Sequence, residues 1–470
     1  MTIRLQRSAA PECWQQPEEA KLLDFGYPGP RTAWRPLAVW SLCVALLGAA
    51  VVLGSRAPAV WTDSLLAAYG VGVLVVMLFT MAVAFGVYRD PGLRPRPPEY
   101  SPLVSFLVAV HNDERVIVRC VESLLASTYE PKEVIVVDDA STDGTVRILR
   151  ELAVVRNFTL IELTTNVGKK RALVKAIESA QGEILAFTDS DSVVAPDALE
   201  RCVSAFAHDR ALGAISGHGR ALNRDQNLLT KIQDVWYDGQ FGIAKAAESA
   251  FGSVTCVSGP LAVFRREAIF NYLPAWANDA FLGREFRFAT DRQLTGYVLG
   301  QRWLDKGQYT TDPLGSQVNY LPQRWKVAYS RSARVLTVVP GNVQSFYRQQ
   351  ARWKKSFIRN LFFTGKFVWR RGVVTTSLYY SHVLFVVCAP VMAFRHLVWL
   401  PTHGEWELCL LYLAGVFFKG WVWSAAYWAQ NPGCGRWVFR PAMSIISALT
   451  LSWLIIYSAL TIRRAVWFRG

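Results

Sequence analysis

Paired carboxylates follow two apolar segments of the chain and are the residues best suited to chemistry. The first pair is Asp138 and Asp139 in the string VVDDASTDGT at 136–145. Carboxylates at the carboxyl end of a strand can accept hydrogen bonds from a uracil imide and a ribose hydroxyl. An Asp-rich turn that caps a helix through Ser141 or Asp143 explains the same string equally well. The string alone leaves both interpretations open.

A second acidic string, FTDSDS at 187–192, also ends an apolar segment. Its Asp189 and Asp191 are two residues apart, so both side chains point to the same side of an extended chain. Hard oxygen ligands at this spacing suit Mg²⁺ or Mn²⁺ bound to a diphosphate. The Asp-x-Asp string is common by chance, but here it follows the first pair by one helix and one strand. Both pairs are therefore predicted on one rim of a sheet.

Between the two acidic strings, NVGKKRA at 166–172 places a glycine and three cations at the start of a predicted helix. Backbone N–H groups and the ammonium groups of Lys169 and Lys170 can hold phosphate there, and a solvated basic helix start is the alternative. His111 and Asn112 end the first apolar segment of the domain. They are predicted to line the same pocket.

Three strings further along the chain add candidates, namely SGPLAVFRREA at 258–268, FATDRQLT at 288–295 and RQQARWKKSFIRN at 348–360. Asp291, beside Arg292, is a candidate general base, because a carboxylate in a cleft can take the proton from an attacking sugar hydroxyl. A surface ion pair is the alternative. Gln349, Arg352 and Trp353 lie on neighbouring helical turns, where Arg can bind phosphate and Trp can cover a sugar ring. An amphipathic helix at a membrane surface is compatible with that interpretation.

The elements that must position these residues follow a repeating pattern between 103 and about 370. Short apolar segments predicted as strands lie at 103–110, 133–139, 159–163 and 183–189. The stretches 114–127 and 169–180 between them have helical spacing. This alternation predicts an α/β domain with a mostly parallel sheet, in which ligands bind at the carboxyl ends of the strands.

Long apolar segments flank this domain. Those at 36–54 and 64–88 are long enough to cross a hydrocarbon core, and three more lie near 375–400, 407–427 and 439–462. The net charge of +15 lies mainly beside these segments, as in cytoplasmic loops, which argues against a nucleic-acid partner. Eight scattered cysteines without paired spacing are predicted to be free thiols. Three full C-terminal spans would leave the basic tail outside, so either one segment lies in the interface or re-enters, or the tail is external.

In this order, the strings resemble those of the processive members of glycosyltransferase family 2, which include hyaluronan, chitin, nodulation chitooligosaccharide and cellulose synthases. The resemblance covers about residues 100–365, and SGPLAVFRREA, TDRQLT and QQARWKKSFIRN are most similar to the hyaluronan synthase version. It implies a GT-A-type nucleotide-sugar-binding domain fused to an α-helical transmembrane bundle. It also implies an inverting transferase that polymerises UDP-GlcNAc and UDP-GlcA on the cytoplasmic face of the plasma membrane. A chitin-type or other β-glycan synthase, and a single-sugar transferase acting on a lipid carrier, are the alternatives.

The resemblance also implies a role for each matching residue. Asp291, Arg292 and Asp191 would be catalytic, and Asp189 and Asp191 would hold Mg²⁺ or Mn²⁺. The implied substrate-binding residues are His111, Asp138, Asp139, Lys169, Lys170, Asp189, Ser258, Gly259, Gln349, Arg352, Trp353 and Trp467. The chain departs from the family where Ala289 and Thr290 replace the usual Gly and acidic residue before Asp291. Its end, RRAVWFRG, resembles a shortened gating loop.

The implied organisation alternates membrane and soluble segments. In chain order these are a cytoplasmic tail at 1–35, two transmembrane helices at 36–88, a cytosolic GT-A domain at 100–340, amphipathic interface helices at 341–372, transmembrane or interface helices at 373–462 and a gating-loop-like tail at 463–470. The expected partners are UDP-sugar donors, the growing polysaccharide and the lipid bilayer, without nucleic acid. A monomer is compatible with this organisation.

Overall fold

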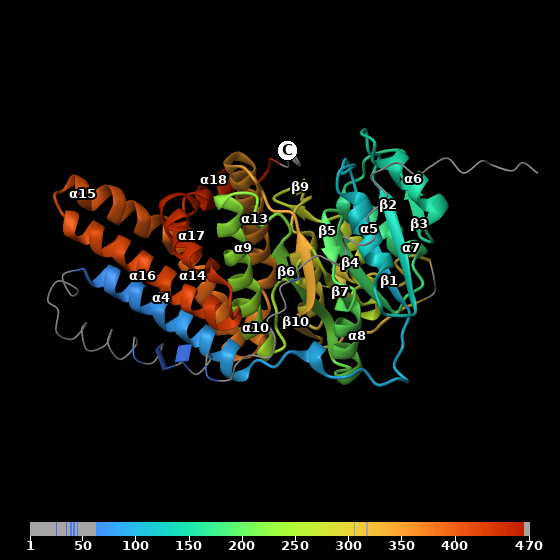
Figure 1. The fold of residues 1–470 in the computed structure, drawn as a ribbon, viewed down its shortest axis with the longest axis horizontal. Coiled ribbons are helices and arrows are strands. Elements are labelled where there is room, and N and C mark those ends of the chain that lie inside the picture. The colour runs from blue at the N-terminus through green and yellow to red at the C-terminus, as the bar shows by residue number, and fades with distance from the viewer. Residues whose placement is uncertain are drawn as a thin grey trace, which may run out of the picture.

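The structure is a computed structural model in which a sheet-centred domain adjoins a bundle of long helices. Figure 1 shows the bundle on the left and the sheet domain on the right. The described residues are 63–464 except 305, 316 and 317, together with Phe25, Trp34, Ala38, Val39, Ser41, Leu42 and Ala45. Most of the predicted span at 36–54, and Trp467 in the predicted gating loop, lie outside the described residues.

One eight-stranded sheet forms the centre of the domain, in the order β3-β2-β1-β4-β7-β6-β10-β5. Its strands are β1 (Val104–Val110), β2 (Lys132–Asp138), β3 (Thr159–Glu162), β4 (Ile184–Asp189), β5 (Ser192–Val194), β6 (Leu212–Ala221), β7 (Ala262–Arg265) and β10 (Lys326–Thr337). β3, β2, β1 and β4 are parallel, as expected of nearly continuous apolar runs buried on both faces. The other half is mixed, because β7 runs antiparallel to both β4 and β6. The predicted α/β fold with a mostly parallel, GT-A-type sheet is confirmed.

The register of the parallel half brings the two acidic strings to the same edge. Val110 of β1 lies opposite Asp138 at the end of β2, and Ala109 lies opposite Asp189 at the end of β4. Because parallel strands end at a common carboxyl edge, the residues that follow β1, β2 and β4 gather there. This is the edge at which the sequence predicts ligand binding.

Helices cover both faces of the sheet. α5 (Ile117–Leu125), α6 (Thr145–Val155) and α8 (Ala198–His208) pack on one face, and α7 (Lys169–Ser179) and α12 (Thr290–Gly300) pack on the other. Alternate side chains of β1 enter the two cores: Phe106 and Val108 join the first, and Leu107 and Ala109 the second. The sheet is therefore buried on both sides, and its carboxyl edge is left for the site.

Apolar helices form the bundle, with α4 (Ser64–Ala82), α14 (Val373–Phe394) and α16 (Trp406–Gln430) as its longest members. Among the described residues, three helices are long and apolar enough to cross a membrane, namely Ser64–Leu93, Val373–Thr402 and Trp406–Gln430. The last apolar segment is bent by 43° between Gly435–Leu451 and Leu454–Leu460. Such a bend is compatible with a broken span or a re-entrant segment. A re-entrant segment is one of the arrangements that the sequence predicts for this part of the chain.

Two helices connect the sheet domain to the bundle and lie between them in Figure 1. α9 (Leu228–Gly239) continues through a π-helical turn (Gln240–Lys245) into α10 (Ala246–Ala250). The other helix, α13 (Val343–Thr364), carries the Gln-x-x-Arg-Trp string. It contacts α18 (Leu454–Leu460), where the Ser458 hydroxyl donates to the Ala351 carbonyl at 3.1 Å.

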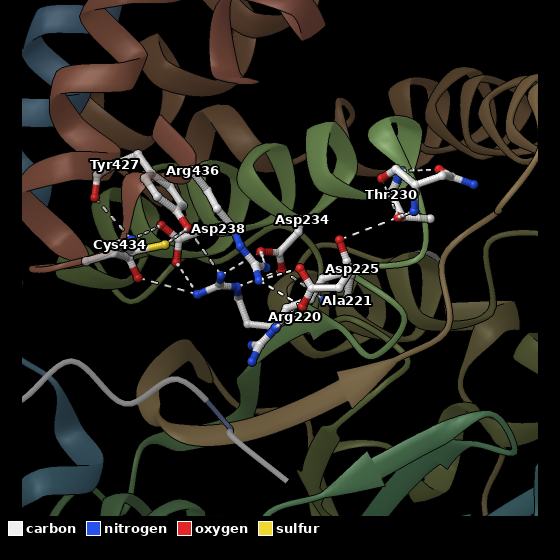
Figure 2. A network of polar contacts seen from close by, with 12 residues as sticks. Arg220, Ala221, Asp225, Thr230, Asp234, Asp238, Tyr427, Cys434 and Arg436 are labelled. Carbon is white, nitrogen blue, oxygen red and sulfur yellow. Dashed lines mark hydrogen bonds and ion pairs between the residues drawn. The ribbon is translucent and has the colours of Figure 1, made fainter. Parts of the chain in front are cut away.

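A buried ion network joins α9 to the sheet and to the end of α16 (Figure 2). Arg220 of β6 donates two hydrogen bonds to Asp234, at 2.9 and 2.7 Å, and both side chains are buried. Arg220 also donates to the Tyr427 hydroxyl of α16 at 3.3 Å, and Asn431 donates to Asp238 at 2.8 Å. Burial raises the pKa of Asp234, but the Arg220 guanidinium outweighs this effect and holds the pKa below its ordinary value. The network thus fixes α9 between the sheet and the bundle.

Replacing Asp234 with Asn is expected to destabilise the protein by about 3–5 kcal/mol, because the buried Arg220 loses its nearest counter-charge and keeps only the more distant Asp238, at 3.7 Å. Asp225→Asn is the matched control. Asp225 accepts from Arg436 at the exposed margin of the same network, where an ion pair contributes about 0–1 kcal/mol. Thermal unfolding in detergent, followed by size-exclusion chromatography, compares the two variants. Equal midpoints for Asp234→Asn and Asp225→Asn would contradict this assignment.

Candidate active site

The carboxyl end of β2 holds the first carboxylate pair. Asp138 is buried; its Oδ2 accepts the Ser141 N–H at 3.0 Å, and its Oδ1 has no hydrogen-bond partner among the described residues. Buried carboxylate oxygens normally accept a hydrogen bond, and a bound ligand could supply the donor for this one. Asp139 instead accepts the N–H groups of Val167 and Gly168, at 2.7 and 2.9 Å. Asp139 therefore anchors the loop in front of α7, while Asp138 keeps one oxygen for a ligand.

Asp189 and Asp191 flank the turn between β4 and β5. Lys169, the first residue of α7, forms an ion pair with Asp189 Oδ1, and the Thr337 hydroxyl donates to Asp191 Oδ1 at 3.2 Å. Within the described part of the chain, no group of three or more His, Cys, Asp and Glu side chains could hold a metal ion. Two carboxylates fit a divalent cation that takes its other ligands from diphosphate oxygens and water, as Mg²⁺ does.

Gly259 lies between the β4 carboxylates and the predicted base. Its N–H donates to Asp291 Oδ2 at 3.3 Å, and a Cβ at this position would come within 2.8 Å of Asp189 Oδ2. Asp291 lies in the first turn of α12, where the helix dipole favours a negative charge. A residue without a side chain is needed for the chain to pass between the two carboxylates. Asp189 and Asp291 therefore face the same glycine.

The predicted residues of α13 lie around the ring of Tyr237 in α9. The centroid of the Trp353 ring lies 5.9 Å from that of Tyr237. The Gln349 side chain lies near the Tyr237 hydroxyl. Burial raises the pKa of Tyr237, the nearby Asp191 raises it further, and Arg352 lowers it in part. The Gln-x-x-Arg-Trp string of α13 therefore lies beside the carboxylate at the end of β4.

Two of the residues at this site, Tyr237 and Lys245, are not among those predicted from the sequence. Lys245 ends the π-helical turn after α9, and its ammonium donates to Ser258 Oγ and, at 3.1 Å, to Ser216 Oγ. Burial lowers the pKa of Lys245 to about 8. The string WYDGQF at 236–241 offers one signal, because it places two aromatic residues side by side, and the rings of both Trp236 and Tyr237 pack against Trp353.

The structure corrects the prediction for Lys170. Its ammonium is buried and donates to Gln293 Oε1 at 2.6 Å, the Phe286 carbonyl at 3.0 Å and Asp279 Oδ2 at 3.2 Å. Successive helical residues are rotated by about 100°, so Lys169 faces the strand edge and Lys170 faces the protein interior. Lys170 therefore ties α7 to α12, with its N–H groups already used, and is not placed to bind phosphate.

The other predicted residues have definite positions. His111 Nδ1 lies 2.9 Å from the Asp139 carbonyl and donates to it, so His111 lines the same edge. Ser258 contacts Lys245, and Arg292 follows Asp291 in α12. Burial lowers the pKa of Arg292, but nearby Cys256 and Asp291 outweigh that effect, and the pKa is raised. The site thus combines acidic groups, cations and an aromatic surface around Gly259 and Tyr237.

Comparison with known proteins gives a match and several relatives. Residues 105–273 match the family model described as glycosyl transferase family 2. The chain is 27% identical over 404 residues to hyaluronan synthase of Streptococcus pyogenes, covering 84% of this chain and 89% of that protein. It is 32% identical over 270 residues to an N-acetylglucosaminyltransferase of Mesorhizobium japonicum, covering 57% and 58% of the two chains.

A solved structure is similar as well. This is the mannosyltransferase PcManGT from Pyrobaculum calidifontis in complex with GDP-Man and Mn²⁺. The sequence identity is 19% and the TM-score is 0.47, over 83% of this chain and 98% of that chain.

Proposed function

We propose that this chain, a glycosyltransferase whose residues 105–273 match the family 2 model, polymerises UDP-GlcNAc and UDP-GlcA into a hyaluronan-type polysaccharide. The observation that carries the proposal is the meeting of Asp191, Gln349, Arg352 and Trp353 around Tyr237. The Gln-x-x-Arg-Trp string goes with processive synthesis in the enzymes that this chain resembles. Similarity to the streptococcal hyaluronan synthase over 84% of this chain supports the choice of polymer.

The donor side of the site would hold the UDP leaving group. Asp138 Oδ1, which has no partner within the described part of the chain, would accept the uracil imide N–H beside His111. Lys169 and Arg352 would place positive charge near the diphosphate. Asp189 and Asp191 would hold Mg²⁺ or Mn²⁺, which supplies positive charge against the negative charge that develops on the leaving diphosphate.

The acceptor side would supply the base and a surface for the sugar. Asp291 would take the proton from the acceptor hydroxyl as that oxygen attacks the anomeric carbon, so transfer is a single displacement with inversion. The Gly259 N–H on Asp291 Oδ2 orients the carboxylate, and Arg292 adds a positive charge beside it. Trp353 and Tyr237 would offer flat apolar faces to the acceptor ring.

The helix bundle would embed the enzyme in the plasma membrane as a multi-pass protein with its catalytic domain in the cytoplasm. Arg94 and Arg96 follow the Ser64–Leu93 helix, and Arg370 and Arg371 precede the Val373–Thr402 helix, in line with the positive charge of cytoplasmic loops. A polymer that leaves Trp353 would enter the adjacent bundle. Synthesis would then be coupled to export of the product.

Purified enzyme in lipid nanodiscs with Mg²⁺ or Mn²⁺ is expected to make polymer only when UDP-GlcNAc and UDP-GlcA are both present. Hyaluronidase should degrade the product, and each UDP-sugar alone serves as the internal control. Polymer made from UDP-GlcNAc alone would indicate a chitin-type synthase. Radiolabel recovered only in a lipid extract would indicate transfer of a single sugar to a lipid carrier. Either result would contradict the proposed product.

A further inference from the structure

Three cations lie between Asp291 and the bundle helix α14 without an ion-pair partner among the described residues. They are Lys245 in the π-helical turn, Arg292 in α12 and Lys354 in α13. Lys170, which is buried, is by contrast paired with Asp279. We call Lys245, Arg292 and Lys354 the cationic cluster.

The three residues of the cationic cluster lie on different elements, but their charges are close enough to repel one another. Arg292 lies within electrostatic range of both Lys245 and Lys354. His382 of α14 is near Arg292 and Lys354, which places the cluster beside a candidate membrane span. The contacts of the Lys245 ammonium are neutral, because it donates to Ser216 and Ser258 and lies 4.1 Å from the centroid of the Phe241 ring.

The nearby carboxylates are fewer than the cations. Glu248 and Asp291 are the two carboxylates near Lys245 and Arg292, so one positive charge of the cationic cluster is left over. Glu248 accepts the backbone N–H and the hydroxyl of Thr255, at 3.1 and 2.9 Å, and Asp291 accepts the Gly259 N–H. Burial lowers the pKa values of Lys245 and Lys354 to about 8. All three cations are half-buried, so an anionic ligand would stabilise them by supplying the charge that the surrounding protein lacks.

We propose that the cationic cluster binds the carboxylate of a uronic acid unit held next to Asp291. Lys245 contacts Ser258, and the next residue, Gly259, orients Asp291, so a carboxylate at Lys245 lies beside the proposed base. A nucleotide diphosphate is the less favoured anion, because Lys169 and Arg352 serve the Asp189 and Asp191 end of the site. This inference rests on the proposed function, since a uronic acid is needed only if UDP-GlcA is a substrate.

The test measures how Lys245→Gln changes recognition of glucuronate and of GlcNAc. In the first arm, isothermal titration of the full-length enzyme is expected to show about tenfold weaker binding of UDP-GlcA and little change for UDP-GlcNAc. In the second arm, UDP-GlcNAc extends an oligosaccharide that ends in glucuronate. Loss in the first arm assigns the carboxylate to the donor, and loss in the second assigns it to the acceptor.

Matched variants show whether a loss of binding comes from the missing charge or from a change in the structure. Lys245→Arg keeps the charge and is expected to retain most of the glucuronate recognition. Lys354→Gln tests the cationic cluster independently if Lys245→Gln does not fold. Lys366→Gln changes an exposed lysine just beyond α13 and should leave both arms unchanged.

Two different failures can be distinguished. Equal losses for glucuronate and GlcNAc ligands, or no loss in either arm, would overturn the role of the cationic cluster while leaving the proposed function intact. Wild-type enzyme that makes polymer without UDP-GlcA and does not bind it would overturn the proposed function and this inference together.

Discussion

Asp291→Asn is expected to lower kcat for sugar transfer by about 10²–10⁴-fold, because an amide cannot take the proton from the acceptor hydroxyl. The substitution preserves the size of the side chain, and the Asn oxygen can still accept the Gly259 N–H that Asp291 accepts at 3.3 Å. The loss should therefore come from chemistry and not from a change of shape. Release of UDP, measured with both UDP-sugars present, reports the rate.

Donor binding provides the control for this variant. Titration with UDP-GlcNAc is expected to give nearly the wild-type affinity, since Asp291 lies on the opposite side of Gly259 from Asp189. Asp209→Asn, which removes an exposed ion pair with Lys326, should keep full activity. An Asp291→Asn enzyme with near-normal turnover would show that another group acts as the base.

Asp191→Asn is expected to lower the rate by about 10²–10³-fold, because the charge that develops on the leaving diphosphate loses part of its stabilisation. The variant should also need much more Mn²⁺ than wild type, since one of two hard ligands becomes a neutral amide. Titration of activity with Mn²⁺ after treatment with EDTA measures both effects.

Two comparisons make this second result specific. Asp197→Asn changes an acidic residue shortly after β5 that pairs with Arg201 at the surface, and its metal dependence should match that of wild type. Wild-type enzyme should itself lose activity in EDTA and regain it with Mn²⁺. An unchanged Mn²⁺ requirement in Asp191→Asn would place the metal elsewhere.

The parallel half of the sheet follows from the sequence because its strands are short apolar runs separated by helices. The predicted segments 103–110, 133–139, 159–163 and 183–189 correspond to β1, β2, β3 and β4. Once these strands are parallel, the residues after them share an edge, so Asp138 and Asp189 can be placed together without coordinates.

The rest of the domain depends on contacts between distant segments that local patterns do not record. β7 is a short antiparallel strand within the string SGPLAVFRREA, and the sequence pattern of that string does not predict a strand. Tyr237 is one aromatic residue of an amphipathic helix, and only the packing of α9 against α13 brings it to Trp353. The same applies to Lys169 and Lys170, because the rotation of α7 against the sheet decides which of them faces the site.

The most direct test is a structure of the wild-type enzyme in nanodiscs with UDP, Mn²⁺ and an acceptor oligosaccharide. Density for the diphosphate is expected between Asp191 and Arg352, with the terminal acceptor ring on Trp353 and its hydroxyl within hydrogen-bond distance of Asp291. Nucleotide or acceptor bound away from these side chains would show that the strand-end carboxylates and α13 do not form one active site.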